Sequence, residues 1–365
     1  METIIYIKSL HRPYNQNLNS VKWVCKFVKD KNTNNKISKS EFYIEFYMYL
    51  INKLFDFYNK NPDHSLTHGI PIFDSIKKAH EGINFIPKDQ RRIYISNAVS
   101  RSQTETEKSI FSTYKAASYF INLAKDKLNF IDKNNNLNSK GLSLVNFRSN
   151  DFVLSRKEKE ILFISIINHD FHFFVSLLLL QKNQKKIKNL TIEELHFTFL
   201  IENFNIRHFS YTETSNEKNY SKVREHWIND LAILDKNLNI KKSFLLIIKN
   251  EGFEQLYNDV KEQVEDYYKN KILPQSKLQN KIDLFKEVYD NSPKNELGFL
   301  ALHEIANQMK MGKASFQDFL SKFYEIEKNK SNIFFNNVVQ AISGKNQFFI
   351  RNRPVVNIRI KKINK

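Results

Sequence analysis

The sequence reads Tyr114-Lys-Ala-Ala-Ser-Tyr-Phe-Ile-Asn-Leu-Ala-Lys-Asp-Lys-Leu128 and continues as Asn129-Phe-Ile-Asp-Lys-Asn-Asn-Asn-Leu-Asn-Ser-Lys-Gly141. The same order of features returns later, where Lys222-Val-Arg-Glu-His-Trp-Ile-Asn-Asp-Leu-Ala-Ile-Leu234 leads into Asp235-Lys-Asn-Leu-Asn239 and Phe244-Leu-Leu-Ile-Ile-Lys-Asn-Glu-Gly252. Each copy predicts a helix, a polar hairpin tip and a strand that closes at a glycine. The chain holds only 7 glycines, so two at matching places favour a repeated structural unit.

This repeated pattern resembles the recognition helix and wing of winged-helix domains. The closures Leu137-Asn-Ser-Lys-Gly141 and Ile248-Lys-Asn-Glu-Gly252 carry the resemblance, together with the helices before them. The resemblance implies that the helix enters the major groove of DNA and that the hairpin contacts the backbone. We therefore expect an α+β fold, mostly helical, with tandem winged-helix modules (helix-turn-helix plus β-hairpin wing). Two ordinary helix-hairpin units within a core are the alternative.

The charge balance agrees with a nucleic-acid partner. The chain has 57 Lys and Arg against 39 Asp and Glu, a formal net charge of +18, and such a balance attracts polyanions. An AT-rich genome would also enrich Lys and Asn without selection for charge. Lys outnumbers Arg, and Lys acts as a point charge for phosphate more than as a reader of base edges. The composition therefore predicts phosphate contact better than it predicts sequence-specific recognition.

The expected compartment is the cytoplasm, with no membrane contact. The single Cys25 leaves no partner for a disulfide within the chain, and the first residues lack the pattern of a secretory signal. The one apolar stretch, Ile161 to Leu180, has Asn168, His169 and Asp170 in its middle, where a bilayer would make polar groups expensive. Two buried helices joined by a turn at these three residues are the expected structure.

The chain divides into four expected units. Composition and turn signals predict strands at Thr3 to Lys8 and Lys22 to Val28, and a helix over Ser40 to Tyr58. Ser112 or Thr113 is a candidate N-cap, and Ser155-Arg-Lys-Glu158 has the pattern of a capping box. The expected units are an N-terminal strand-hairpin plus helix unit (1–74), winged-helix module 1 (75–150), winged-helix module 2 (151–270) and a C-terminal helical unit with a basic β-hairpin (271–365).

The C-terminal unit has its own helix-helix-hairpin pattern. Helices are predicted over Lys277 to Tyr289, Glu296 to Met311 and Ser315 to Glu327, and strands over Gln347 to Ile350 and Val355 to Ile363. Arg351-Asn-Arg-Pro354 is the expected hairpin tip, and from Lys345 onward the chain has seven basic residues and no acidic one. This order is compatible with a further winged-helix variant, and equally with a solvated basic terminus.

Motifs for catalysis are few, and we expect no catalytic centre, metal or cofactor. The scattered glycines form no phosphate-cradling loop, and His303-Glu-Ile-Ala-Asn307 lacks the second histidine of a zincin helix. His64 with His68 and His169 with His172 are interpreted as structural. A metal-dependent nuclease core needs an acid-x-Lys on a strand, but Asp259-Val-Lys261 lies in a segment with helical periodicity. The chain is thus more readily a binding protein than an enzyme.

The predicted DNA contacts are polar residues outside the apolar stripes of the two helices, and cations of the hairpins. Asn and Arg can read base edges, whereas Lys contacts phosphates. The predicted set is Lys115, Ser118, Asn122, Lys125, Lys133, Lys140, Lys222, Arg224, His226, Asn229, Lys236, Lys241, Lys242, Arg351, Arg353 and Arg359.

Four functions follow as hypotheses. The first is a non-catalytic subunit that engages double-stranded DNA for a separate nuclease or ATPase, because the chain is similar in overall look to winged-helix subunits of bacterial restriction and phage-defence systems. The second is a plasmid or phage replication initiator. The third is an assembly subunit of an ATPase complex of the chromosome-organising type, whose winged helices bind protein. The fourth is an unrecognised nuclease.

Overall fold

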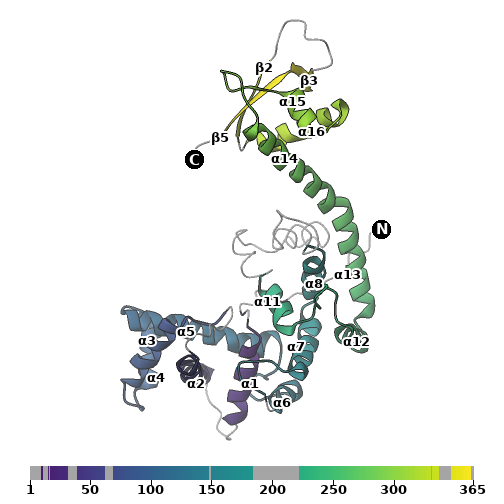
Figure 1. The fold of residues 1–365 in the computed structure, drawn as a ribbon. Helices are drawn as coiled ribbons and strands as arrows, with labels where there is room; N and C mark the ends of the chain where they lie inside the picture. Colours follow the sequence, from purple (N-terminus) through teal and green to yellow (C-terminus); the bar gives the residue numbers. More distant parts are fainter. Residues whose placement is uncertain are drawn as a thin grey trace. The chain divides into compact units, whose positions relative to one another are not determined.

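The computed structural model describes residues 10, 15, 17–31, 39–61, 69–147, 149–183, 222–329, 331–336 and 347–362. The chain is mostly helical with small antiparallel sheets, which confirms the α+β class (Figure 1). It divides into two compact units, Met1–Glu265 and Asp266–Lys365. Expected features at 3–8, 64, 68 and 345 lie outside the described residues.

The regular elements that the structure describes in the first unit are all helices. Its elements in chain order are α1 (Asn19–Asp30), α2 (Lys39–Lys60), α3 (Phe73–Asn84), α4 (Arg91–Arg101), α5 (Glu105–Asn122), the π-helical turn η1 (Leu123–Lys127), α6 (Ser139–Val145), α7 (Arg156–His169), α8 (His172–Asn183), α11 (Lys222–Leu231), α12 (Lys242–Asn250) and α13 (Glu254–Tyr267). The boundaries expected at 74 and 150 fall inside this unit.

Helix α1 replaces the strand predicted over Lys22 to Val28. The β-branched and aromatic composition suggested a strand. However, Val21, Val24 and Val28 are all buried, and their spacing of three and four is that of one helix face. Tertiary burial of this face outweighs the weak strand propensity.

Two capping boxes fix helix starts. Ser155 and Glu158 form the predicted box at the start of α7, each side chain bonding the other's backbone N–H. The start of α5 differs from expectation, because Thr104 and Glu107 form the box there. Thr113, a candidate cap in the sequence, instead lies buried inside α5.

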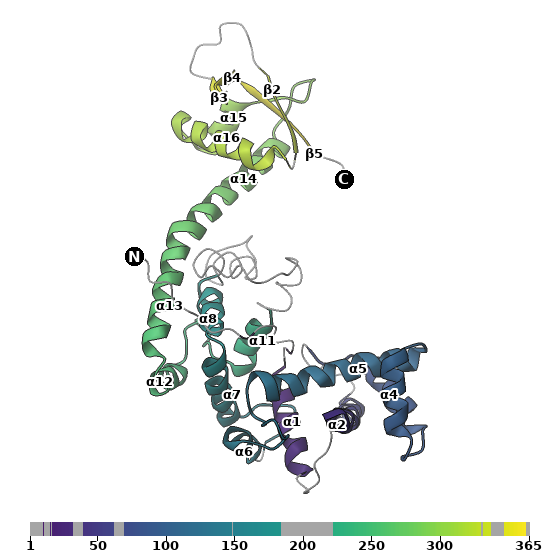
Figure 2. The same cartoon turned by 180° about the vertical axis from the view of Figure 1, so that it is seen from behind.

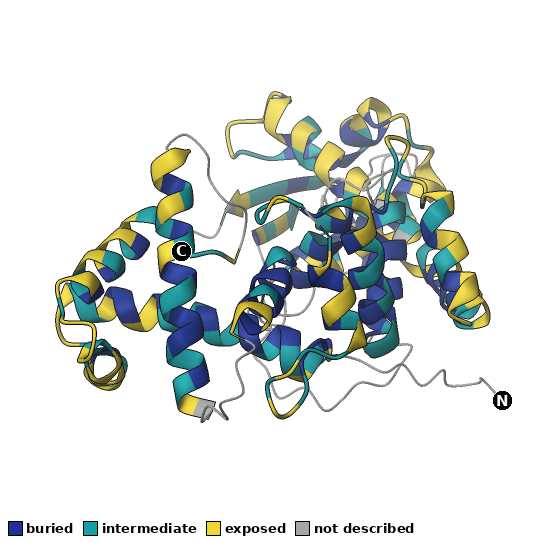
Figure 3. Ribbon diagram, turned by 90° about the horizontal axis from the view of Figure 1, so that it is seen from below, coloured by how far each residue is buried: buried dark blue, intermediate teal, exposed yellow. Residues whose placement is uncertain are grey.

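The core of the first unit is rich in aromatic side chains. Trp23 of α1 lies 6.0 Å from Phe120 of α5 between ring centroids, and both side chains are buried. The buried residues follow the helix faces that pack on one another, as the dark segments of Figure 3 show. Full burial of side chains of this size contributes roughly 1.5–3 kcal/mol each to folding.

Helices α7 and α8 confirm the two-helix interpretation of the apolar stretch. The chain turns at Asp170 and bends by 113° between them. No described helix has by itself the length and apolar character required to cross a membrane; only the bent pair meets that test jointly.

The second unit joins three helices to strands. After the π-helical turn η3 (Tyr268–Ile272) come α14 (Leu273–Asn291), β1 (Leu300–Ala301), α15 (Leu302–Gln308), α16 (Lys313–Glu327), β2 (Ser331–Asn336), β3 (Phe348–Ile350), β4 (Arg353–Val355) and β5 (Asn357–Lys362). Strand β5 lies between β1 and β2 in an antiparallel sheet, and β3 pairs with β4 in a separate hairpin. Figures 1 and 2 show α15 and α16 on one side of the long strands.

One face of this sheet packs on the helices. Ile358 is fully buried, and Ile333 and Ile360 pack against the same core as Phe285 and Phe323. The alternate residues of β5 therefore lie on the opposite face of the sheet. That face includes the cationic residues Arg359 and Lys361.

Candidate nucleic-acid interface

The repeated polar segment forms the same tight turn in both copies. Asp132 Oδ1 accepts hydrogen bonds from the backbone N–H groups of Asn134 and Asn136, each at 2.8 Å. Asp235 Oδ1 does the same for Asn237 and Asn239, also at 2.8 Å. A side-chain acceptor that replaces backbone partners in this way is the mechanism by which Asp favours turns.

The turns also share their left-handed positions. Asn135 and Leu238 have φ values of 63° and 62° at the equivalent place. Asn tolerates this region, whereas Leu is unusual there, so the surrounding bonds must hold the second turn in shape. Each turn is closed by a single β-bridge, Ile131 to Leu137 and Leu234 to Ile240.

The prediction of a β-hairpin wing in each copy is wrong, because a helix follows each turn. The strand expected over Phe244 to Ile248 is helix α12, and Gly141 lies inside α6. Phe244 and Ile248 are both buried and four residues apart, which is a helical spacing that the short apolar run concealed.

A third copy of the turn was missed in the sequence. Asn295 Oδ1 accepts from the backbone N–H groups of Leu297 (3.1 Å) and Phe299 (2.9 Å), and Gly298 has φ 77° at the left-handed place. Two residues could have revealed this turn in the sequence: Asn295 at the place of Asp132 and Asp235, and Gly298 three positions later. Two helices follow every copy: α6 and α7, α12 and α13, α15 and α16. The helix before each turn is thus the first of three, and it is not followed by a wing.

Several predicted contacts of the first helix are used within the protein. Lys125 Nζ donates to the backbone carbonyl of Lys133 (3.2 Å) and to Asn135 Oδ1 (2.6 Å), which holds the turn. The Asn122 amide donates to Asp126 at 2.9 Å. Of the predicted set here, Lys115 and Lys133 are exposed, whereas Ser118 and Lys140 are half-buried. These residues do not form one free recognition face.

Arg224 corrects the prediction most clearly. Its side chain is fully buried, and its guanidinium pairs with the equally buried Asp170. The interior position removes it from any DNA contact. The pattern of polar residues on α11 did not reveal that the face with Arg224 packs against α8 and Leu10.

The other predicted residues of the second copy lie at or near the surface. Lys241 Nζ donates to the backbone carbonyl of Ala232 at 2.6 Å. His226 is half-buried. The remaining predicted residues are exposed, namely Lys222, Asn229, Lys236 and Lys242.

The basic hairpin is partly anchored to α16. Arg351 pairs with Glu325 (Nη2 to Oε1, 3.0 Å) and lies 5.3 Å from the Tyr324 ring centroid. The Gln317 amide donates to the Phe349 carbonyl at 2.6 Å and accepts from the Phe349 N–H at 2.7 Å. The hairpin of β3 and β4 thus covers one flank of α16. Its turn is Arg351 and Asn352, so the predicted tip is two residues too long, because Arg353 and Pro354 belong to β4.

Arg359 is held between two aromatic rings on the outer face of the sheet. Its guanidinium lies 5.0 Å from the Phe299 centroid and 4.9 Å from that of Phe334. Its Nη1 donates to the Leu297 carbonyl at 3.0 Å. Lys361, two positions later on β5, is exposed, and so is Arg353 on β4 of the hairpin.

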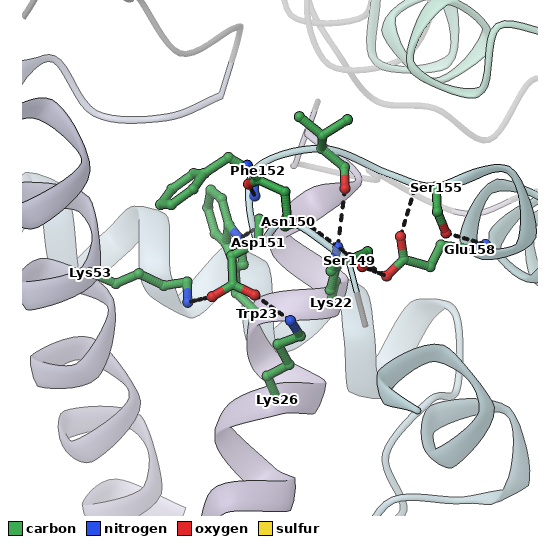
Figure 4. Close-up of polar contacts among 11 residues, drawn as sticks. Lys22, Trp23, Lys26, Lys53, Ser149, Asn150, Asp151, Phe152, Ser155 and Glu158 are labelled. Carbon is green, nitrogen blue, oxygen red and sulfur yellow. Dashed lines mark hydrogen bonds and ion pairs between the residues drawn. The ribbon is translucent and has the colours of Figure 1, made fainter. Parts of the chain in front are cut away.

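The densest polar centre was not predicted, and Figure 4 shows it. The fully buried Lys22 of α1 forms an ion pair with Glu158 at 2.9 Å and donates to Ser149 Oγ at 2.7 Å. It also donates to the carbonyls of Asn150 (2.6 Å) and Val153 (3.1 Å). Burial lowers the pKa of Lys22 more than its contact with Glu158 raises it.

Asp151 ties the same loop to two helices. Its carboxylate pairs with Lys26 of α1 and Lys53 of α2, and its carbonyl accepts from Trp23 Nε1 at 2.6 Å. Burial alone would raise the pKa of Asp151, but the hydrogen bonds from the two lysines lower it overall. This centre fastens the segment between α6 and α7, and its donors are occupied by protein groups.

Across the residues that the structure describes, no group of three or more His, Cys, Asp or Glu is placed to hold a metal ion. Asp259 and Lys261 lie on helix α13, as the periodicity predicted.

The chain has no match among family models, characterised proteins or solved structures.

Proposed function

We propose that the protein binds double-stranded DNA through its second unit, which has the element order of a winged helix. The observation that carries the proposal is the succession α14, β1, α15, α16, β2 and β5 with β5 central in an antiparallel sheet. In such a domain the second helix of the helix-turn-helix faces the groove, and the strand-rich end contacts phosphates.

The charge of this unit supports a phosphate partner. Lys361 is exposed on β5 of the sheet and Arg353 on β4 of the separate hairpin. Lys313 and Lys322 are exposed on α16, where Lys322 pairs with Asp318 at 2.8 Å. Arg359 presents a guanidinium fixed by its two aromatic neighbours. Lysines and arginines near a helix-turn-helix supply the sequence-independent part of DNA affinity.

This proposal moves the interface away from the helices first considered. In the segments at 114–128 and 222–234, the side chains of Lys125, Asn122 and Arg224 bind other groups of the protein. The wider role, as the DNA-engaging subunit beside a separate nuclease or ATPase, belongs to the same proposal.

A second function, docking to protein, is favoured by one observation. The β3–β4 hairpin covers a flank of α16 through Gln317 and Glu325, and Asp318 lies exposed on the same helix. Acidic side chains facing DNA would be repelled by phosphates. A winged helix that serves as an assembly module would show this mixed surface.

Fluorescence anisotropy with a labelled duplex separates the two functions. The double variant Arg353→Gln/Lys361→Gln removes two exposed cations from the second unit. Lys77→Gln/Lys78→Gln removes two exposed cations from α3 and is the matched control. If each cation neutralises one phosphate, the slope of log affinity against log salt should become shallower by about 1.8 in the first variant and stay unchanged in the control.

If both double variants change the salt slope equally, the duplex is attracted by the net charge of the protein and not by a particular surface. That result would reject the assigned interface. Undetectable binding of wild-type protein at low salt would reject DNA binding and favour docking. Cleavage of the duplex with magnesium or manganese would support the nuclease alternative. High specificity for repeated sites would favour the replication initiator.

A further inference from the structure

A basic cavity lies within the first unit. It has a volume of about 420 Å³ and is bounded by the first turns of α7 and α12 and by the end of α11. Its floor is apolar, with Leu154, Leu231 and Phe244 buried. Its polar side carries Arg156, Lys159, Glu160, Lys241 and Ser243.

The cations of this cavity exceed the nearby acids. Three basic side chains line it, against the single acid Glu160, which pairs with Arg156 at 3.0 Å. Asp230 lies near Lys159 but also accepts the Leu18 N–H at 3.4 Å. The cavity therefore keeps an excess of positive charge.

Two of these cations repel each other. Burial lowers the pKa of the half-buried Lys159, the nearby Asp230 opposes this change, and Lys241 lowers the pKa by a smaller amount. Like charges held together in a partly desolvated place are unfavourable unless an anion joins them. With Glu160 and Asp230 counted against Arg156, Lys159 and Lys241, one positive charge remains for an anion to balance.

The start of α12 adds donors to the same cavity. In the first copy of the turn, Asn138 Oδ1 caps α6 by accepting from Gly141 N at 2.9 Å. Lys241 occupies the equivalent place in the second copy, has no acceptor, and leaves α12 without a side-chain cap. Backbone N–H groups at a helix start carry partial positive charge and bind anions.

We propose that this cavity binds a phosphate group. Its volume lies in the range of small-molecule sites, and the apolar floor would accept a sugar or base beside the phosphate. The phosphate is either the monoester of a free phosphorylated metabolite or a diester of a nucleic-acid backbone. The site does not depend on DNA binding by the second unit.

Isothermal titration of the full chain with sodium pyrophosphate tests the site. Lys159→Gln removes one cation from the cavity and should weaken pyrophosphate binding about tenfold, the loss expected for one charge-assisted hydrogen bond. Lys249→Gln removes an exposed cation at the other end of α12 and should leave the affinity unchanged. The proposal fails if wild-type protein shows no saturable binding, or if both variants weaken binding equally.

Ser243→Asp is a second variant that tests the same site if Lys159→Gln does not fold. An acid in the first turn of α12 favours the helix, so thermal stability should be unchanged or raised. The same carboxylate should repel phosphate and abolish pyrophosphate binding. Retained binding in this folded variant would overturn the site.

Two further ligands identify the source of the phosphate. Adenosine 5′-monophosphate carries a monoester, and a single-stranded oligonucleotide with a 5′-hydroxyl carries only diesters. Loss of the preferred ligand's binding in Lys159→Gln supports the site in either case. Because Arg353→Gln/Lys361→Gln leaves this cavity intact, that variant should bind pyrophosphate normally. Undetectable duplex binding by the wild-type protein together with normal pyrophosphate binding would reject only the function of the second unit.

Discussion

Arg224 and Asp170 meet through two contacts, Nε to Oδ2 at 2.7 Å and Nη2 to Oδ1 at 3.0 Å, with neither side chain exposed. The same pair holds Leu10, whose carbonyl accepts from Nη2 and whose N–H donates to Oδ1. A buried bidentate pair with further hydrogen bonds satisfies the groups that burial would otherwise leave uncompensated.

Removing one partner of this pair should strongly destabilise the first unit. Arg224→Ala is expected to lower the free energy of unfolding by about 3–5 kcal/mol, because Asp170 would remain charged and buried. Urea denaturation followed by circular dichroism measures the change. Asn229→Ala, on the exposed side of α11, is the control and should change stability by about 0.5 kcal/mol or less. A small effect of Arg224→Ala would show that the pair is solvated.

The Asp turns should contribute measurably to stability. Asp132→Ala and Asp235→Ala each remove the acceptor of two backbone N–H groups and should lower the free energy of unfolding by about 0.5–2 kcal/mol, as loss of a helix cap does. Asp132→Asn and Asp235→Asn keep an acceptor oxygen and should recover most of the loss. Equal effects of Ala and Asn would argue that charge, and not the turn bonds, is responsible.

Acid should loosen the loop between α6 and α7. Burial alone would raise the pKa of Glu158, but hydrogen bonds from Ser149, from the Ser155 N–H and from Lys22 lower it overall. A carboxyl with a lowered folded pKa stabilises the protein above its unfolded pKa of about 4.3, and this stabilisation is lost as pH falls through the folded value. The free energy of unfolding should therefore decrease below about pH 4.3.

Denaturant midpoints measured from pH 6 down to pH 3 test this pH dependence. Glu158→Gln should be less stable at pH 6 and should lose less stability on acidification than wild type. Glu254→Gln, at an exposed carboxylate of α13, should follow the wild-type profile. An unchanged acid profile in Glu158→Gln would assign the pH dependence to other groups, including Asp151, whose pKa is also lowered.

Residues of the first repeated helix should separate into core and turn roles. Phe120→Ala should cost about 3–5 kcal/mol through the cavity it leaves, because the side chain is buried beside Trp23. Lys115→Ala should change stability by about 0.5 kcal/mol or less because it is exposed. Lys125→Ala should destabilise more than Lys115→Ala, because it holds Asn135 in the turn. Thermal unfolding compares the three variants, and equal melting temperatures for the two lysine variants would exclude this role.

Local signals in the sequence predicted some elements well. The capping box at Ser155 and the turn before His172 follow from residues within a few positions of one another. The helix Ser40 to Tyr58 was predicted from its apolar spacing and is α2. Such features depend on local chemistry, which a single sequence displays.

Features set by distant packing were not predictable. Lys22 and Arg224 appear in the sequence as ordinary surface cations, and only the approach of residues more than fifty positions away buries them. The repeat was recognised, but the run after Asp235 was assigned to a strand, because a short apolar segment fits both strand and helix. Nothing local distinguishes α12 from a wing.

The contacts of Leu10 and Asn15 also constrain the order in which the parts of the chain can fold during synthesis. Leu10 reaches Arg224 and Asn15 reaches Trp227, partners that are 214 and 212 positions later in the chain. A ribosome must therefore release residues beyond Trp227 before the N-terminal segment finds its native partners. Long-range closure of this kind slows folding and leaves apolar surface exposed in the meantime. Leu10 and Asn15 are therefore synthesised long before the partners that hold them in place.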